Sequence, residues 1–196
     1  MIYEFVGLPA TGKTTLINEL VEKQLGAKIV LNNKRKIFFW YCYGFLRHPI
    51  LFFEGVYLVM KYRPQLSIFW NYHVIRYAKL SVAELHPGVC FVDESPLSNV
   101  HSLLDKQSNE NDIAYIYKKS WSLGIIVHMT QEERVRLERS RARNREAVNE
   151  YNPAWNEHAK RTDVFLQVQL RDRCDVLYVT DDNTQLVIDS IRDHDV

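Results

Sequence analysis

The stretch IYEFVGLPATGKTTLINEL, residues 2–20, decides the fold. An apolar run ends at Gly7, and residues 7–14 fit the pattern G-x-x-x-x-G-K-[ST]. Gly7 and Gly12 allow backbone turns that a Cβ would obstruct, so that successive N–H groups can surround an anion. A helix that begins near Lys13 adds the partial positive charge of its first turn. The pattern predicts a strand at 2–6, a loop that binds the phosphates of a nucleoside triphosphate, and a helix at 13–25.

The side chains of this loop have distinct expected roles. Lys13 can reach the β- and γ-phosphates, and the Thr14 hydroxyl can ligate Mg²⁺. A glycine turn that binds nothing is the alternative, but the strand before the loop and the amphipathic helix after it disfavour that interpretation. ATP is therefore expected to contact the whole loop, namely Gly7, Leu8, Pro9, Ala10, Thr11, Gly12, Lys13, Thr14 and Thr15.

Composition excludes several classes of protein. The chain has 196 residues, of which 46% are hydrophobic, which is enough for one domain with its own core. Its 25 basic and 24 acidic side chains nearly cancel, so no nucleic-acid partner is expected. Cys42, Cys90 and Cys174 are far apart and form no C-x-x-C pair, which favours free thiols in a reducing compartment. With no signal peptide recognised at the N-terminus, the predicted location is the cytoplasm.

Apolar runs alternate with helical patterns along the chain. The expected strands are 2–6, 27–31, 89–92, 125–129 and 175–180. Because these runs are continuously apolar, the sequence predicts an α/β fold with a five-stranded parallel sheet and helices on both faces. The intervening helices are expected at 13–25, 37–85 with breaks at Pro49 and Pro64, 112–122 and 153–171. Further helices are expected from Pro96, after Asn183, and after Thr130, where Thr130 and Glu133 fit a capping box. Ligands of such sheets bind beyond the carboxyl ends of the strands. The phosphate loop, a basic turn at 32–36, Asp93-Glu94 and the segment after Thr130 should meet on that rim.

Residues 37–60 are unusually apolar and aromatic. Arg47, His48, Pro49 and Glu54 interrupt the segment, which disfavours a membrane span and predicts two helices hinged near His48-Pro49. Core packing is the favoured interpretation; contact with a hydrophobic acceptor or a membrane surface is the alternative. We expect one domain, 1–196, with an aromatic-rich helical insertion on the acceptor side at about 37–86.

Asp93 and Glu94 follow the apolar strand at 89–92. A carboxylate there can hold Mg²⁺ opposite Thr14, and its neighbour can orient or deprotonate an attacking hydroxyl. Either residue could be that base. The alternative is an acidic helix start favoured by the helix dipole.

A third cluster consists of arginines in the segment 134–145. Arg136, Arg139 and Arg143 share one helical face, and no lysine is present in this run. The fixed fork of Arg suits bidentate contact with phosphate and can neutralise the charge of a moving phosphoryl group. A solvated helix laced with Glu–Arg pairs is the alternative.

This three-part arrangement resembles the small P-loop kinases of the nucleoside and nucleotide kinase superfamily. The most similar branch is that of thymidylate and deoxynucleoside kinases, with related kinases of surface-polysaccharide gene clusters. The resemblance implies ATP on residues 7–15, Asp93 at the strand-end acidic position and residues 180–183 near the adenine. It also implies a mobile lid at about 138–152 that contains Arg139, Arg141, Arg143 and Arg145.

The sequence departs from that family directly after the strand-end acid. Those kinases commonly carry an Arg that contacts the acceptor, whereas this chain has Glu94. The departure favours a hydroxyl acceptor over one with a phosphate or carboxylate at this point. Lys34, Arg35 and Arg63 are candidates to restore positive charge. Trp40, Tyr41, Phe69 and Trp70 are candidates to stack on a base or sugar, with core packing the more common role for each.

The sequence as a whole predicts an ATP- and Mg²⁺-dependent kinase that phosphorylates a small-molecule hydroxyl acceptor of nucleoside, nucleotide or sugar type, lipid-linked or aromatic acceptors included. Lys13, Asp93, Glu94, Arg139, Arg141, Arg143 and Arg145 are its candidate catalytic residues, and Thr14 and Asp93 its candidate Mg²⁺ ligands. A regulatory or binding module that hydrolyses a nucleoside triphosphate is the alternative. A GTPase switch is disfavoured because Asn33-Lys34-Arg35-Lys36 lacks the Asp of N-K-x-D. The oligomeric state stays open, a homodimer included.

Overall fold

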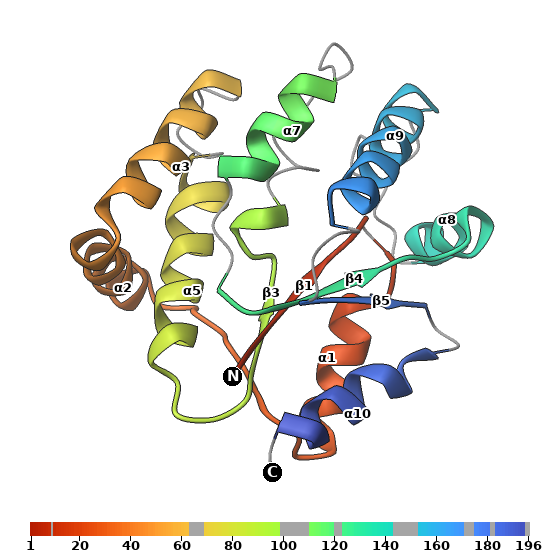
Figure 1. Ribbon diagram of the computed structural model, residues 1–196, viewed down its shortest axis with the longest axis horizontal. Helices are drawn as coiled ribbons and strands as arrows, with labels where there is room; N and C mark the ends of the chain where they lie inside the picture. The colour runs from red at the N-terminus through yellow and green to blue at the C-terminus, as the bar shows by residue number, and fades with distance from the viewer. Residues whose placement is uncertain are drawn as a thin grey trace.

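The computed structural model describes residues 1–8, 10–62, 69–98, 110–119, 123–142, 153–170, 175–180 and 183–194. It is an α/β structure in which helices cover both faces of one sheet (Figure 1). Five strands lie in the order β2-β3-β1-β4-β5, and every pair of neighbours is parallel. The predicted fold class is therefore confirmed.

The N-terminal strand and helix match their predicted positions closely. Strand β1 spans Ile2–Val6 and lies between β3 (Cys90–Asp93) and β4 (Ile125–Met129) at the centre of the sheet. Helix α1 spans Lys13–Glu22, so it ends three residues before the predicted boundary. Gln24 has a positive φ of 57°, a conformation that does not continue a helix.

The outer strands are shorter than predicted. Strand β2 spans only Ala27–Lys28 and pairs with β3 through Ala27↔Cys90 and Lys28↔Phe91. At the opposite edge, β5 spans Val176–Val179 and pairs with β4. The predicted extents of 27–31 and 175–180 were thus too long at both edges, where each strand has a neighbour on one side alone.

One face of the sheet is covered by α1 and by α10 (Gln185–His194). Alternate strand residues point into this layer, and Tyr3, Phe5, Phe91 and Val127 are completely buried there against the helices. The helices contribute Leu16, Ile17 and Leu20 from α1 and Val187, Ile188 and Ile191 from α10. Burial at this density fixes α1, and therefore the loop before it, against the carboxyl end of the sheet.

The opposite face is covered by helices of the central and C-terminal parts of the chain (Figure 1). These are α3 (Pro49–Tyr62), α5 (Ile75–Leu85), α7 (Glu110–Lys119) and α9 (Pro153–Leu170). Strand residues Val6 and Ile126 pack against Leu58 of α3 and Leu166 of α9. Side chains on both faces of the central strands are therefore buried against helices, which explains why these strands are continuously apolar.

The aromatic-rich segment is helical, as predicted, and divides where proline interrupts it. Helix α2 spans Lys34–Arg47 and α3 begins at Pro49, so the predicted hinge at His48-Pro49 is confirmed. A π-helical turn, η1 (Trp70–Val74), leads into α5. The predicted break at Pro64 lies outside the described residues, as does Arg63.

The predicted basic turn at 32–36 is wrong. Lys34, Arg35 and Lys36 form the first turn of α2, because the side chain of Asn33 accepts hydrogen bonds from the backbone N–H groups of Arg35 and Lys36. The predicted capping box at Thr130 and Glu133 is also wrong. The Thr130 N–H donates to the carbonyl of Val179, and α8 (Glu133–Ala142) begins at Glu133.

The remaining predictions differ only at element boundaries. The described residues after Ser95 form a 3₁₀ turn, η2 (Pro96–Ser98), and the continuation of the predicted helix lies outside the described residues. Helix α7 (Glu110–Lys119) overlaps the predicted range of 112–122, and residues 120–122 lie outside the described part of the chain. Helices α9 and α10 lie where the proline and asparagine signals predict them. Within the described part of the chain, no helix has the length and apolar character required to cross a bilayer.

Candidate functional site

The phosphate loop is shaped by positive φ angles. Gly7 has φ 132°, and a Cβ at this position would lie 2.2 Å from the Met129 carbonyl oxygen. Gly12 has φ 94° in the left-handed region and precedes the first residue of α1. Between them, Ala10 adopts φ 63°. The loop therefore bends closely around the end of β4, a path that explains both glycines of the motif. Pro9 lies outside the described residues.

Lys13 lies across this loop. Its ammonium group donates hydrogen bonds of 2.8 Å to the carbonyl oxygens of Gly7 and Leu8. Burial lowers the pKa of Lys13 to about 8, and the nearby carboxylates of Asp93 and Glu94 oppose that shift. A phosphate group bound in the loop would supply a stronger partner for this charge than the two neutral carbonyl oxygens do.

Thr14 and Asp93 meet at the rim. The Thr14 hydroxyl donates a hydrogen bond of 3.0 Å to Oδ2 of Asp93, although the residues lie far apart in the sequence. The contact joins the first turn of α1 to the end of β3, as the parallel topology predicts. A hydroxyl and a carboxylate oxygen are ligands that Mg²⁺ accepts alongside phosphate oxygens and water. The residues present therefore fit a Mg²⁺ ion.

The backbone turns sharply after Asp93. Glu94 has φ 61°, a conformation that costs a residue with a Cβ about 1 kcal/mol or more. Its side chain is exposed, whereas Ser95 and Pro96 immediately after it are buried. Strain of this kind persists where the surrounding structure fixes the backbone.

Two cations on α5 lie beside these carboxylates, and sequence reasoning did not identify either. Arg76 is buried, with its guanidinium 4.6 Å from the ring centre of Tyr72. Burial lowers the pKa of Arg76, and Glu94 is the largest opposing influence. Lys79 donates a hydrogen bond of 3.0 Å to the backbone carbonyl of Asp93. Positive charge beside Asp93 and Glu94 thus comes from α5 rather than from the position after Asp93.

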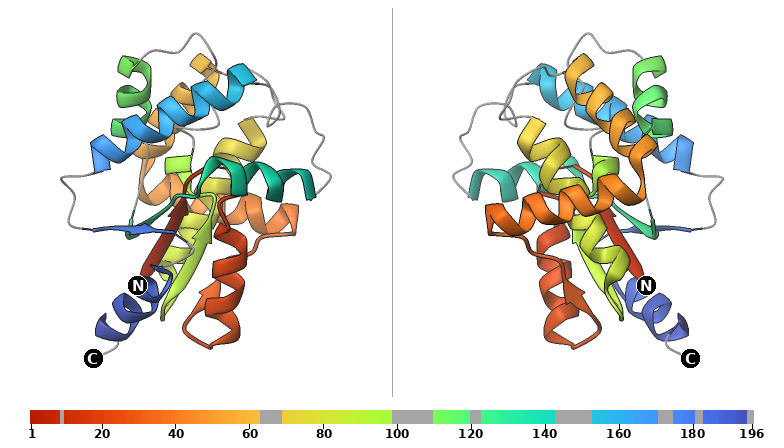
Figure 2. Two further views of the ribbon diagram at one scale, coloured as in Figure 1. Left: turned by 90° about the vertical axis from the view of Figure 1, so that its right-hand side faces the viewer. Right: turned by 90° about the vertical axis from the view of Figure 1, so that its left-hand side faces the viewer.

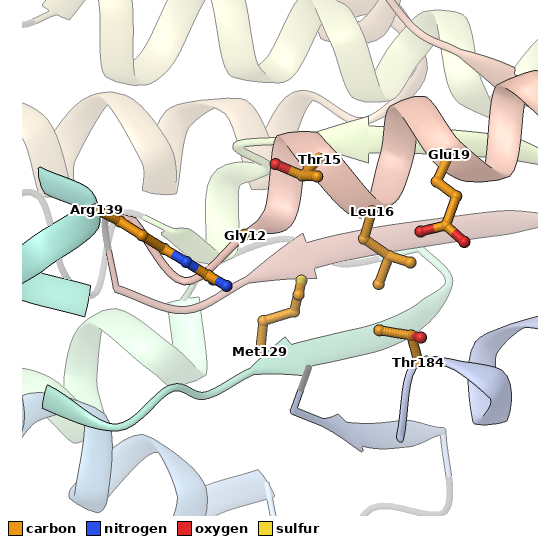
Figure 3. A pocket seen from close by; sticks show the side chains of 7 residues that line it. All are labelled: Gly12, Thr15, Leu16, Glu19, Met129, Arg139 and Thr184. Carbon is orange, nitrogen blue, oxygen red and sulfur yellow. The ribbon is translucent and has the colours of Figure 1, made fainter. Parts of the chain in front are cut away.

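Arg139 reaches the phosphate loop from α8. A cavity of about 500 Å³ lies beside α1 and is lined by Gly12, Thr15, Leu16, Glu19, Met129, Arg139 and Thr184. Figure 3 shows the Arg139 side chain extending from α8 toward Gly12, with Thr184 at the other end of the cavity. Thr184 directly follows the segment 180–183 that was expected near the adenine. A nucleotide base and its phosphates can thus be accommodated along one side of α1.

Of the other candidate arginines, one is buried in the structure and the side chains of the rest are not described by it. Arg136 is almost fully buried, one helical turn before Arg139, so this face of α8 points into the protein. The interpretation of α8 as a wholly solvated helix is therefore wrong for these two residues. The side chain of Arg141 and the whole of Arg143 and Arg145 lie outside the described residues.

A buried polar pair lies behind the phosphate loop. Nε2 of His128 on β4 lies 3.1 Å from Oδ1 of Asp163 on α9, and both residues are buried. Asp163 also contributes to the electrostatic environment of Lys13. Sequence reasoning missed this pair because the two residues are far apart in the chain, and a single Asp within a helix carries no signal of its own.

The aromatic candidates for the acceptor site pack against one another. Trp40, Tyr41, Phe69 and Trp70 are partly buried around a core formed by Ile37, Val74 and Ala78. The Tyr41 hydroxyl lies 2.9 Å from Nε2 of His73, which is completely buried. Burial lowers the pKa of His73 to about 3, so its imidazole is neutral at ordinary pH. Lys34 and Arg35 are exposed in the first turn of α2.

No protein-family model matches the sequence, and no curated protein matches it. Solved structures do share the fold. One is deoxyadenosine kinase from M. mycoides with dCMP and dCDP bound, at a TM-score of 0.61 and 13% identity, covering 98% of this chain and 100% of the other. The same kinase with bound dATP has a TM-score of 0.61 at 12% identity and the same coverage of both chains. At these identities the likeness establishes a common fold.

Proposed function

We propose that this protein is a kinase that transfers the γ-phosphate of ATP to a hydroxyl group of a small-molecule acceptor of nucleoside, nucleotide or sugar type. The observation that carries the proposal is the contact between Thr14 and Asp93 beside the phosphate loop. It brings a P-loop hydroxyl and a strand-end carboxylate together where a kinase needs its Mg²⁺ ligands. Bound Mg²⁺ would neutralise charge on the β- and γ-phosphates.

The roles of the other residues follow from their contacts. Lys13 is held by carbonyl oxygens of the loop and would turn its ammonium group to the phosphates. Arg139 would add positive charge from the other side of the cavity. With Asp93 engaged by Thr14, the exposed Glu94 is the better candidate for the general base. These assignments divide the site into a donor side and an acceptor side.

The proposed reaction is a direct transfer of the γ-phosphoryl group from ATP to the acceptor hydroxyl. The acceptor oxygen forms a bond to the γ-phosphorus, while the bond from that phosphorus to the β,γ-bridging oxygen breaks and ADP leaves. Glu94 takes the proton of the attacking hydroxyl. Lys13 and Arg139 stabilise the charge on the oxygens of the phosphoryl group as it moves.

The charges of Glu94, Arg76 and Lys79 indicate whether the acceptor is itself charged. Arg76 and Lys79 lie close enough to Glu94 for its charge to influence both of their pKa values. Positive charge near the acceptor is therefore already balanced by a carboxylate, which favours an uncharged hydroxyl over a phosphate at this point. The solved structures that share the fold include a deoxyadenosine kinase, so deoxynucleosides are the acceptors to test first.

The test is ATP turnover with Mg²⁺ in the presence of individual nucleosides, nucleotides, sugars and sugar nucleotides, with phosphorylated product identified by mass spectrometry. We expect one acceptor class to raise turnover well above the rate of hydrolysis. Lys13→Ala should abolish that increase. Lys118→Ala, which removes an exposed lysine of α7, should retain it. Hydrolysis that depends on Lys13 but responds to no acceptor would instead favour the regulatory alternative.

A further inference from the structure

Helix α3 is apolar on two opposite faces. Its inner face is completely buried, with Phe52, Leu58 and Val59 in the core. Its outer face carries Ile50, Phe53, Tyr57 and Met60, all exposed, at the spacing of three and four residues that aligns side chains along a helix. A helix that is apolar all round is usually covered on both sides. Among the described residues, Tyr115 of α7 contacts this outer face at Tyr57, with ring centroids 6.4 Å apart, and Ile50, Phe53 and Met60 remain exposed.

Helix α2 extends this apolar surface. Phe38, Phe39 and Leu46 are exposed on it, and Leu46 is 80% exposed. One residue, His48, separates the two helices, and the rings of Phe45 and Phe53 touch across the hinge with centroids 5.4 Å apart. The exposed residues of both helices therefore belong to one structural unit, the α2–α3 hairpin (Lys34–Tyr62). It lies at the left of Figure 1 and toward the viewer in the right panel of Figure 2.

The hairpin also concentrates positive charge. It contains Lys34, Arg35, Lys36, Arg47 and Lys61 but only one acidic residue, Glu54, while the whole chain has a net charge of +1. Arg47 is paired with Glu84, and Lys61 lies 4.8 Å from the ring centre of Tyr115. The first turn of α2 therefore supplies three exposed cations at one end of the apolar surface.

We propose that the α2–α3 hairpin docks on the surface of an anionic phospholipid bilayer. Exposed aromatic and aliphatic side chains flanked by lysine and arginine are the features of helices that lie in the membrane interface. Anionic headgroups would pair with the first turn of α2, while the apolar residues would enter the headgroup–acyl boundary. A second copy of the chain is a poorer occupant, because a two-fold interface between identical hairpins would bring surplus positive charge together. The proposal does not depend on the kinase activity.

The first experiment is co-sedimentation of the wild-type protein with vesicles of phosphatidylcholine alone or mixed with phosphatidylglycerol. We expect binding to the anionic vesicles to be at least about tenfold stronger and to weaken as salt is raised, since interfacial charge is screened. Equal binding to both vesicles, or no binding to either, would overturn the proposal without the need for any variant.

Two variants separate the apolar and charged contributions. Ile50→Ser with Phe53→Ser should weaken binding to anionic vesicles by about tenfold or more, because the inserted apolar area is lost. Lys34→Gln with Lys36→Gln should weaken it by about fivefold for each charge removed. The matched control is Val164→Ser with Val168→Ser, which removes two exposed apolar side chains from α9 and should leave binding unchanged.

Sedimentation velocity without lipid distinguishes a lipid surface from a second copy. We expect a monomer both for the wild type and for the Ile50→Ser, Phe53→Ser variant, with similar melting temperatures for the two. A wild-type dimer that the variant dissociates would identify the hairpin as a subunit interface and overturn the proposal. If the variant melts early, the comparison of lipid compositions with wild-type protein decides the question alone.

Discussion

The two sides of the strand-end rim are built in different ways. On the donor side, the phosphate loop uses backbone conformation, with positive φ angles at Gly7, Ala10 and Gly12. On the proposed acceptor side, Lys79 of α5 donates a hydrogen bond to the carbonyl of Asp93, and Arg76 of α5 lies within the electrostatic influence of Glu94. A backbone cradle is specified by a few residues close in sequence. A side-chain environment depends on how distant helices pack, so it can change while the loop stays the same.

The largest expected effect is on the donor side. Lys13→Ala should lower kcat for ATP turnover by about 1,000-fold or more, because the ammonium charge is used at the transferring phosphate. Lys118→Ala should remain close to wild type, since Lys118 is exposed on α7 and does not line the cavity beside α1. Steady-state turnover of both variants, with circular dichroism to verify folding, is the measurement. Near-normal turnover in Lys13→Ala would contradict the donor-side assignment.

Asp93→Asn tests the residue that joins the two sides. We expect kcat to fall by about 100-fold and half-maximal activity to require more Mg²⁺, because a neutral amide is a weaker ligand than a carboxylate. A Mg²⁺ titration of turnover measures both effects. Asp189→Asn, at an exposed position in α10, is the control. An unchanged titration in Asp93→Asn would remove Asp93 from the metal site.

The acceptor side is tested by a double-mutant cycle. Glu94→Gln and Arg76→Met should each lower kcat/KM for the acceptor by about 10- to 100-fold and leave the KM for ATP unchanged. The double variant should lose less than the product of the two single effects, because each residue sets the charge environment of the other. Strictly multiplicative effects would show that Arg76 and Glu94 act independently. Arg76→Lys retains the positive charge, so its kcat/KM indicates how much of the effect of Arg76 depends on the shape of the guanidinium group.

A smaller effect is expected at the edge of the donor cavity. Arg139→Gln should reduce kcat by about tenfold with little change in ATP affinity, because its charge matters most in the transition state. Arg134→Gln is the matched control on the same helix, since Arg134 is exposed and paired with Glu138. A loss of melting temperature without a loss of kcat would make Arg139 a structural residue.

The final prediction concerns pH. The free protein has a Lys13 pKa of about 8, so kcat/KM for ATP should fall about tenfold for each pH unit above that value as the charge is lost. The contribution of Lys13 to folding stability should change in the opposite direction. Between about pH 8 and the ordinary lysine pKa of 10.5, the unfolded chain binds more protons, so this contribution rises with pH. Lys13→Arg should abolish the decline in kcat/KM over this range.

The sequence was informative where one short segment determines the structure. The strands, the phosphate loop and the rim position of Asp93 could all be predicted, because glycine spacing and continuous apolar runs are local signals. Asn33 is also a local signal, because Asn is a common helix N-cap, but the polar run at 32–36 predicts a turn. In the structure Asn33 caps α2 and brings Lys34, Arg35 and Lys36 into the helix.

The parts that could not be predicted depend on packing between distant segments. Arg76 belongs to a helix rich in apolar residues, and nothing nearby in the sequence indicates that it lies beside Glu94. The contact between His128 and Asp163 likewise requires β4 and α9 to be placed against each other. The Thr130 and Glu133 pattern failed for a related reason. The backbone N–H of Thr130 is used by the neighbouring edge strand, so the helix begins later.

The backbone of Glu94 has a consequence for efforts to make this protein more robust. A glycine would relieve the strain of φ 61° and raise the melting temperature, with a gain of about 1 kcal/mol. The same change would delete the carboxylate that we propose accepts the acceptor proton. Selection for heat resistance and selection for turnover would therefore favour different residues at position 94, and a library screened only for stability would accumulate well-folded, inactive protein.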